Sequence, residues 1–168
     1  MNIRSVSLAA SLLVVFATGS IARNSHDSQQ SPASQAPPSG RASAAPTPAC
    51  GPNLAAQVKN VADNSRCFEL RTYTVQPGSS IDLLHSRFRD HTTALFMKHG
   101  MTIIGYWQPL TKPNVLVYML AYKDAAARDA SWAAFNADPE WVKTRTAMQV
   151  NLQVDNLFMS ATDYSPMK

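Results

Sequence analysis

The stretch Phe-Glu-Leu-Arg-Thr-Tyr-Thr-Val, residues 68–75, decides the fold. Its side chains alternate between two faces, as those of a β-strand do, and it holds the aromatic and β-branched residues that strands favour. One face carries a phenylalanine, a leucine and two threonines, whereas the other carries Glu69, Arg71 and Tyr73. We therefore predict a strand whose apolar side is buried by the elements that follow it.

Downstream of this strand the pattern predicts three helices and three more strands. The first helix has apolar residues at helical spacing, a serine at its start and a glycine at its end. Asp124 and Asp138 are N-caps for the other two helices. The predicted elements are a helix from Ser79 to Gly100, strands over 101–108 and 115–122, helices over 125–136 and from Pro139, and a last strand over 150–159.

This order is β-α-β-β-α-β, with the last two helices in the second helical position. It is typical of the α+β class with a ferredoxin-like fold, in which helices cover one face of a four-stranded antiparallel sheet. The second face of such a sheet would be wet in a monomer. We therefore expect a homodimer in which two sheets meet face to face.

The first 50 residues of the chain are predicted to serve export. Residues 1–22 read as a signal peptide, because Arg4 precedes an apolar run too short to remain as a membrane span. An uncleaved anchor and an organelle transit peptide are the alternatives. Residues 23–50 are rich in Ser, Pro and Ala and are expected to form a disordered linker. The expected location is periplasmic or secreted, with no lasting membrane span.

Residues 51–65 are predicted to form a short helical transition into the domain at 66–168. The only two cysteines, Cys50 and Cys67, flank it. In an oxidising compartment they could form a disulfide that fastens this segment to the first strand. The alternative is two unpaired small residues.

The net charge of +4 does not indicate a nucleic-acid partner. Residues 66–168 hold 11 Lys and Arg against 9 Asp and Glu, and they contain no basic block. A nucleic-acid surface needs clustered positive charge. We therefore expect no nucleic-acid binding.

Five residues are candidates for ligand binding. Arg71, beside Tyr73, could bind an acidic ligand in a bidentate manner; alternatively, a Glu69–Arg71 pair fixes the register of the sheet. Three aromatic residues could line a small apolar cavity or belong to the core: Tyr106, Trp107 and Trp132.

His91 is the candidate catalytic residue. At its spacing from the apolar residues of the first helix it faces the sheet, where a neutral imidazole could act as a general base or as a metal or haem ligand. The alternative is a structural histidine in the core. The four histidines lack zinc-site spacing, so no metal site and no cofactor are predicted, and haem at His91 is the least favoured reading.

Several segments, in the right order, resemble a NIPSNAP domain. They are the opening strand with Pro-Gly at 77–78, His-Gly-Met at 99–101, Gly-Tyr-Trp at 105–107, Ala-Asp-Pro-Glu-Trp at 137–141 and Thr-Asp-Tyr-Ser-Pro-Met-Lys at 162–168. The resemblance covers about residues 66–168 and implies a dimeric α+β barrel in an exported, bacterial-type member. Relatives with that fold include cofactor-free monooxygenases, haem enzymes and non-catalytic modules. No catalytic residues can be carried over from this family, and fold does not settle function.

Two functions agree with these observations. The first is a dimeric module that binds a partner or a small apolar or acidic molecule. The second is a small enzyme of the dimeric α/β-barrel type, either a cofactor-free monooxygenase or a proton-transfer enzyme with His91 as base. The binding module is preferred because the sequence contains no catalytic constellation.

Overall fold

The computed structural model describes residues 46–52, 54 and 58–168. The predicted signal peptide over 1–22, and the linker up to residue 45, lie outside this described part. Among the described residues, no helix combines the length and the apolarity that crossing a bilayer requires.

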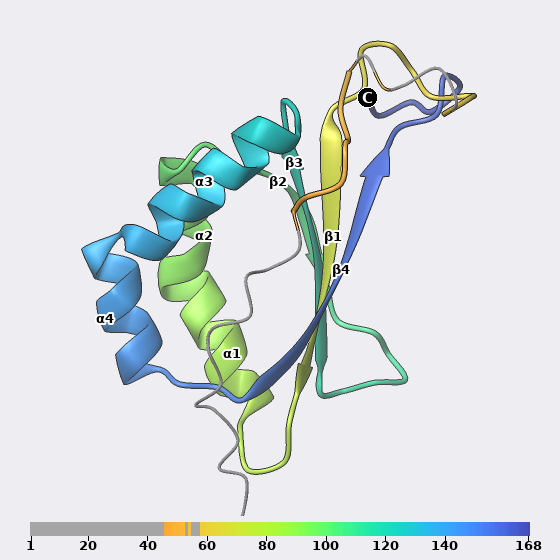
Figure 1. Cartoon of the computed structure of the whole chain (residues 1–168). Helices are drawn as coiled ribbons and strands as arrows, with labels where there is room; N and C mark the ends of the chain where they lie inside the picture. The colour runs from red at the N-terminus through yellow and green to blue at the C-terminus, as the bar shows by residue number, and fades with distance from the viewer. Residues whose placement is uncertain (1–45, 53, 55–57) are drawn as a thin grey trace, which may run out of the picture. The chain divides into compact units, whose positions relative to one another are not determined.

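The described elements form a four-stranded antiparallel sheet with every helix on one face (Figure 1). The strand order is β2-β3-β1-β4, so β1 and β3 are central. This confirms the predicted α+β, ferredoxin-like fold. In chain order the elements are β1 (Cys67–Val75), α1 (Ile81–Arg87), η1 (Phe88–Thr92), α2 (Thr93–Lys98), β2 (Thr102–Trp107), β3 (Val115–Tyr122), α3 (Ala125–Ala137), α4 (Pro139–Ala147) and β4 (Leu152–Ser160).

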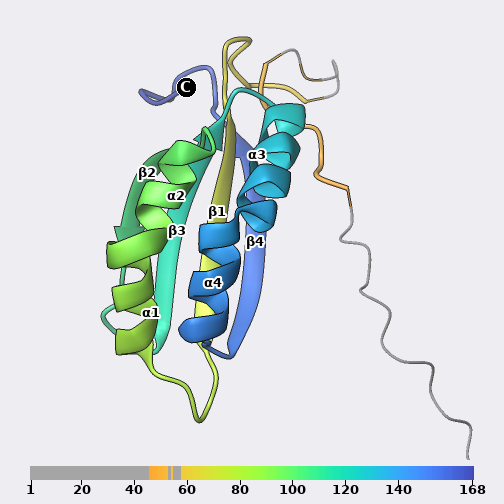
Figure 2. The same ribbon diagram turned by 90° about the vertical axis from the view of Figure 1, so that its left-hand side faces the viewer.

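The helix boundaries follow local capping chemistry. Ser80, one residue after the predicted cap, accepts a hydrogen bond from the Leu83 backbone N–H at 3.3 Å and starts α1. Asp124 and Asp138 cap α3 and α4 as predicted, each accepting a backbone N–H with its carboxylate. Figure 2 shows α1 and α2 in one line beside α3 and α4, all lying over the sheet.

The polar face of β1 is the one that packs against the helices, which corrects the sequence-based expectation that its apolar side is buried by them. Glu69 is 0% exposed and Arg71 is 8% exposed, whereas Leu70 and Thr72 on the opposite face are only half-buried. A buried ion pair replaces the apolar contacts that a strand normally makes there. The physical reason is that aromatic side chains and a second arginine surround this pair, as described below.

One turn of the first helix is π-helical. The helix runs without a break from α1 through η1 to α2, and the Thr92 and Thr93 hydroxyls donate hydrogen bonds to the carbonyls of Arg87 and Phe88, at 3.2 and 2.8 Å. A π turn holds one residue more than an α turn. Thr92, four residues after the buried Phe88, is the buried inward residue of this turn, whereas His91, which the sequence analysis placed facing the sheet, is half-buried.

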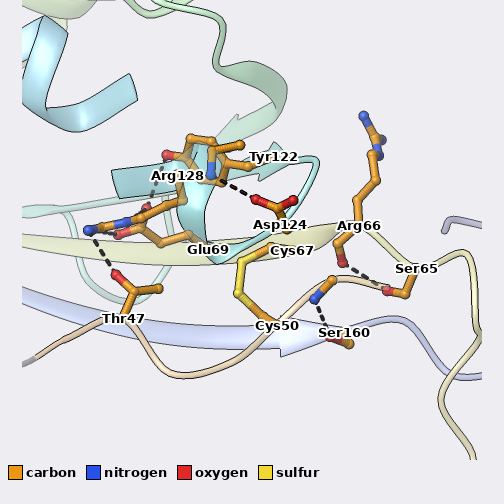
Figure 3. The surroundings of a disulfide bond; sticks show 12 residues. Thr47, Cys50, Ser65, Arg66, Cys67, Glu69, Tyr122, Asp124, Arg128 and Ser160 are labelled. Carbon is orange, nitrogen blue, oxygen red and sulfur yellow. Dashed lines mark hydrogen bonds and ion pairs between the residues drawn. A yellow bond between two sulfur atoms is a disulfide. The ribbon is translucent and has the colours of Figure 1, made fainter. Parts of the chain in front are cut away.

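The segment before β1 is fastened to the domain by a disulfide between Cys50 and Cys67 (Figure 3). The Gly51 backbone N–H also donates to the Ser160 hydroxyl at 3.0 Å. Residues 46–50, predicted as the end of a disordered linker, are thus placed against the domain. The helix predicted over 51–65 falls partly on residues outside the described part; its described residues form bends, turns and one bridge from Val61 to Thr162.

Candidate functional site

A cavity of about 460 Å³ lies between the sheet and the helices. We call it the arginine cleft, because its lining contains four arginines and no aspartate or glutamate. The arginines are Arg71, Arg87, Arg128 and Arg145. The aromatic side chains of the lining are Tyr73, Phe88, Phe96, Trp132, Phe135 and Trp141. Cations and aromatic surfaces in one concave site are typical of binding sites for organic anions.

Glu69 does not itself line the cleft. Its carboxylate accepts hydrogen bonds from residues of both central strands and of α3. Its carboxylate accepts from Arg71 at 2.6 Å and from Arg128 at 2.8 and 3.2 Å. The Tyr122 hydroxyl and the Trp132 indole N–H also donate to it, at 3.1 and 2.9 Å. Burial alone would raise the pKa of Glu69, but Arg128 and Arg71 outweigh burial and hold that pKa below its ordinary value.

Arg71 and Arg128 share the Glu69 carboxylate, and the carboxylate of Asp129, 3.1 Å from Arg128, supplies a second negative charge. Arg71 also donates to the Tyr73 hydroxyl at 3.2 Å, and its guanidinium carbon lies 4.4 Å from the centroid of the Trp132 ring. Arg128 makes a further bond to Thr47, in the segment before the disulfide, at 3.2 Å (Figure 3). These contacts fix the two side chains in place, so this end of the cleft is rigid and nearly balanced in charge.

Arg87 differs from these two because no carboxylate faces it among the described residues. It is 5% exposed, and its single protein hydrogen bond there runs from Nη1 to the Met148 carbonyl at 3.1 Å. Its guanidinium carbon lies 5.6 Å from the centroid of the Trp141 ring. Burial lowers the pKa of Arg87, yet a guanidinium stays charged in proteins. A buried cation without a counter-ion is costly, and an anion bound in the cleft would reduce that cost.

Unsatisfied polar atoms gather around the same cavity. Among the described residues, four buried side-chain polar atoms lack a hydrogen-bond partner: Arg71 Nε, Arg87 Nε, Trp141 Nε1 and the Tyr118 hydroxyl. The first three belong to residues that line the arginine cleft, and all three are donors. Unpaired buried polar atoms are uncommon in proteins and call for an explanation. A ligand rich in acceptors is one.

The five residues that the sequence predicted to bind a ligand lie in two different cavities of the structure. Arg71, Tyr73 and Trp132 line the arginine cleft. Tyr106 and Trp107 line a second cleft of about 350 Å³ on the other side of η1, together with His85 and Gln108. Arg71 pairs with Glu69, as one reading of the sequence predicted, and it also lines the cavity; ligand binding by Arg71 stays a prediction.

Sequence reasoning missed Arg87, Arg128 and Arg145. Each lies on a helix, where a lone arginine resembles an ordinary solvated charge. A signal was present for Arg87, since it stands three residues after Leu84 and is therefore on the apolar stripe of its helix. The candidate catalytic residue, His91, lines neither cleft.

Comparisons with known proteins agree with this fold. The sequence model of the NIPSNAP family matches residues 68–166. A search of the curated proteins gave no match. Among solved structures, a NIPSNAP family protein of unknown function from Agrobacterium tumefaciens has a TM-score of 0.55 at 22% identity, over 61% of this chain and 94% of that chain. An uncharacterized NIPSNAP-like domain protein from Burkholderia xenovorans has a TM-score of 0.54 at 21% identity, over 60% and 89%.

A cofactor-independent oxygenase from Streptomyces nogalater, SnoaB, is more distant. Its TM-score is 0.45 at 17% identity, over 61% of this chain and 98% of that chain. Similarity at this level carries no argument about activity. The two NIPSNAP structures, both below 25% identity, support the fold alone.

Proposed function

The chain belongs to the NIPSNAP family, and on that premise we propose that its domain is a binding module that holds a small organic anion in the arginine cleft. The observation that carries the proposal is Arg87, a buried guanidinium that lines the cavity and faces no carboxylate among the described residues. A carboxylate bound there would form charge-assisted hydrogen bonds, which are about twice as strong as neutral ones.

A thermal-shift comparison of small organic acids with amines of matched size tests this function. Ligands that bind only the folded state raise its melting temperature. We expect stabilisation by acids and not by amines, and we expect Arg87→Gln to abolish it. Arg89→Gln is the matched control, because Arg89 is an exposed arginine on the same helix that lines only the second cleft. Equal stabilisation by acids and amines would contradict the proposal.

The alternative of an enzyme with His91 as general base gains no support from the geometry. A general base must reach the proton that it removes, directly or through one water. His91 lines neither cleft among the described residues, and no specific observation here favours oxidation or proton transfer.

We also propose that the domain is a homodimer formed through the bare face of the sheet. Residues paired directly across an antiparallel sheet share a face, and Leu70 pairs with both Met119 and Leu157. Leu157 is 55% exposed. Glu69, the neighbour of Leu70 on β1, points toward α3, so this apolar row lies on the other face, which Figure 1 shows without helices; a second copy of the same surface would cover it.

Export to an oxidising compartment is a further part of the proposal. Its support is the Cys50–Cys67 bond, because structural disulfides persist outside the cytosol and are rare within it. Mass measurement of the protein after export, with and without reductant, tests this: an oxidised pair is expected, and two free thiols would contradict it.

A further inference from the structure

We infer that the anion is a flat aromatic monocarboxylate, bound with its carboxylate at Arg87 and its ring among the aromatic side chains of the cleft. This inference rests on the proposed function, because it names the class of anion and its orientation. Three features of the arginine cleft carry it: the uneven charge of its two ends, the helix terminus beside Arg87, and the aromatic wall.

The uneven charge places the carboxylate at Arg87. At one end, Glu69 already accepts from both Arg71 and Arg128, at 2.6 and 2.8 Å. At the other end, Arg87 and Arg145 both line the cleft and have no carboxylate within ion-pair distance among the described residues. An incoming anion therefore gains more at the Arg87 end, where it meets two positive charges that no carboxylate of the described residues offsets.

The terminus of α4 limits the ligand to a single negative charge. The carbonyl that Arg87 contacts belongs to Met148, the C-cap of α4, and Arg145 lies in the last turn of that helix. The C-terminal end of a helix carries about half a negative charge. That partial charge opposes a second negative charge on the ligand.

The walls of the cleft favour a flat ring over an aliphatic chain. Phe135 lies between Trp132 and Trp141, with ring centroids 5.5 and 4.5 Å away. Phe96 extends this row, since its centroid is 5.0 Å from that of Phe135. Phe96 and Phe135 are only 1% exposed and form the backing of this wall, so the half-buried rings of Tyr73 and Trp132 are the ones that the aromatic ring of a ligand can meet, in edge-to-face or offset packing.

A series of four naphthalene derivatives tests the inference by isothermal titration of the full protein. The probes are 2-naphthoate, its saturated analogue decahydro-2-naphthoate, the neutral 2-naphthamide and naphthalene-2,6-dicarboxylate. We expect 2-naphthoate to bind most tightly. The amide should bind at least about tenfold more weakly, because it lacks the charge. The saturated acid should also be weaker, and the dicarboxylate should gain nothing from its second charge.

Variants assign the orientation. Arg87→Gln should lower the affinity for 2-naphthoate by about ten- to a hundredfold, because one charge-assisted contact is lost. Arg87→Lys should recover part of this, because it keeps the charge without the planar fork. Arg145→Gln, at an exposed position where folding is not at risk, should also weaken binding. Arg89→Gln should leave the affinity unchanged.

The possible failures are distinguishable. If the saturated acid binds as tightly as 2-naphthoate, the aromatic class is wrong while anion binding in the cleft stands. If the dicarboxylate binds more tightly than 2-naphthoate, the claim that the ligand carries a single negative charge is wrong. If the amide equals the acid, or if Arg87→Gln and Arg145→Gln both leave binding unchanged in folded protein, both this inference and the proposed function fall.

Discussion

At the scale of single residues, Glu69 decides which arginines of the cleft are free to bind. It is fully buried and pairs with both Arg71 and Arg128, so Arg87 is left as the buried cation without a carboxylate among the described residues. The same carboxylate holds β1, β3 and α3 together through its bonds to Tyr122 and Trp132. One residue thereby links the stability of the domain to the charge of its cleft.

We predict that Glu69→Gln lowers the free energy of unfolding by about 3 kcal/mol at pH 7, because removing one member of a buried ion pair leaves its partners uncompensated. Urea unfolding measures this. Glu140→Gln is the control, since Glu140 is exposed and forms no ion pair among the described residues. A loss below about 0.5 kcal/mol, the usual range of surface changes, would contradict the role given to Glu69.

The pH dependence of stability supplies an independent check. The pKa of Glu69 is lower in the folded protein than its ordinary value, so on acidification the unfolded chain takes up the proton first. The stabilisation is complete above about pH 4.3, the unfolded pKa, and is lost as the pH falls toward the folded pKa. The pKa of Asp138 is also lowered by folding, so Asp138 adds to the loss of stability in acid. Its contribution is the same in the wild type and in Glu69→Gln, because both proteins contain it. The free energy of unfolding of Glu69→Gln should therefore fall less between pH 7 and pH 3 than that of the wild type. If the two proteins lose the same free energy of unfolding over this range, Glu69 does not cause the pH dependence.

His91→Ala should leave the affinity for 2-naphthoate within about twofold and the free energy of unfolding within about 1 kcal/mol. The reason is that His91 lines neither cleft and is only half-buried. Titration calorimetry and urea unfolding on one preparation decide between the outcomes. A large loss of affinity in a stable variant would place His91 in the site after all.

At this scale the sequence predicted part of the site. Arg71, Tyr73 and Trp132 were identified because they stand on a strand of unusual polarity or are large aromatic residues. Arg128 could not be identified, because its partner is Glu69, 59 residues away in the sequence, and only the packing of α3 on β1 brings them together. Long-range ion pairs leave no local periodic signal.

At the scale of elements, the strands and the capped helices were predictable because their signals are local. Alternation in β1, aspartate caps before α3 and α4, and the glycine after α2 each fix a boundary through neighbouring backbone groups. The π turn was not predictable in this way. The buried positions Phe88 and Thr92 keep the four-residue spacing of an ordinary α-helix, so the sequence pattern carries no signal of the π turn.

The Cys50–Cys67 disulfide links the segment before β1 covalently to that strand. It closes a loop of 17 residues and holds the segment that carries Thr47 beside Arg128. Reduction should lower the free energy of unfolding by about 3 kcal/mol, the amount that loop closure of this length gives. The double variant Cys50→Ser, Cys67→Ser is the control, because its stability should not respond to reductant. Equal stability of the oxidised and reduced wild type would contradict a structural role for the bond.

At the scale of the whole molecule, the sheet has one face under helices and one that carries none of them in the described part of the chain (Figures 1 and 2). If the second face forms a homodimer, Leu157→Asp should convert the dimer to a monomer, since it buries a charge in an apolar contact. Light scattering after size-exclusion chromatography measures this. Val142→Asp on α4, where Val142 is also exposed, should stay dimeric. A monomeric wild type would rule the proposed assembly out.

The central claim of this account is that Arg87 binds the anion. The most direct test is the ¹H–¹⁵N NMR signal of its side-chain Nε–H during titration with 2-naphthoate, assigned by its loss in Arg87→Lys. The Nε–H of Arg87 is buried and unpartnered among the described residues, so a carboxylate on this guanidinium should shift its signal, saturating at the calorimetric affinity, while the Arg71 signal moves less because Glu69 already holds that side chain. An Arg87 signal that stays in place while 2-naphthoate saturates the protein would contradict the claim.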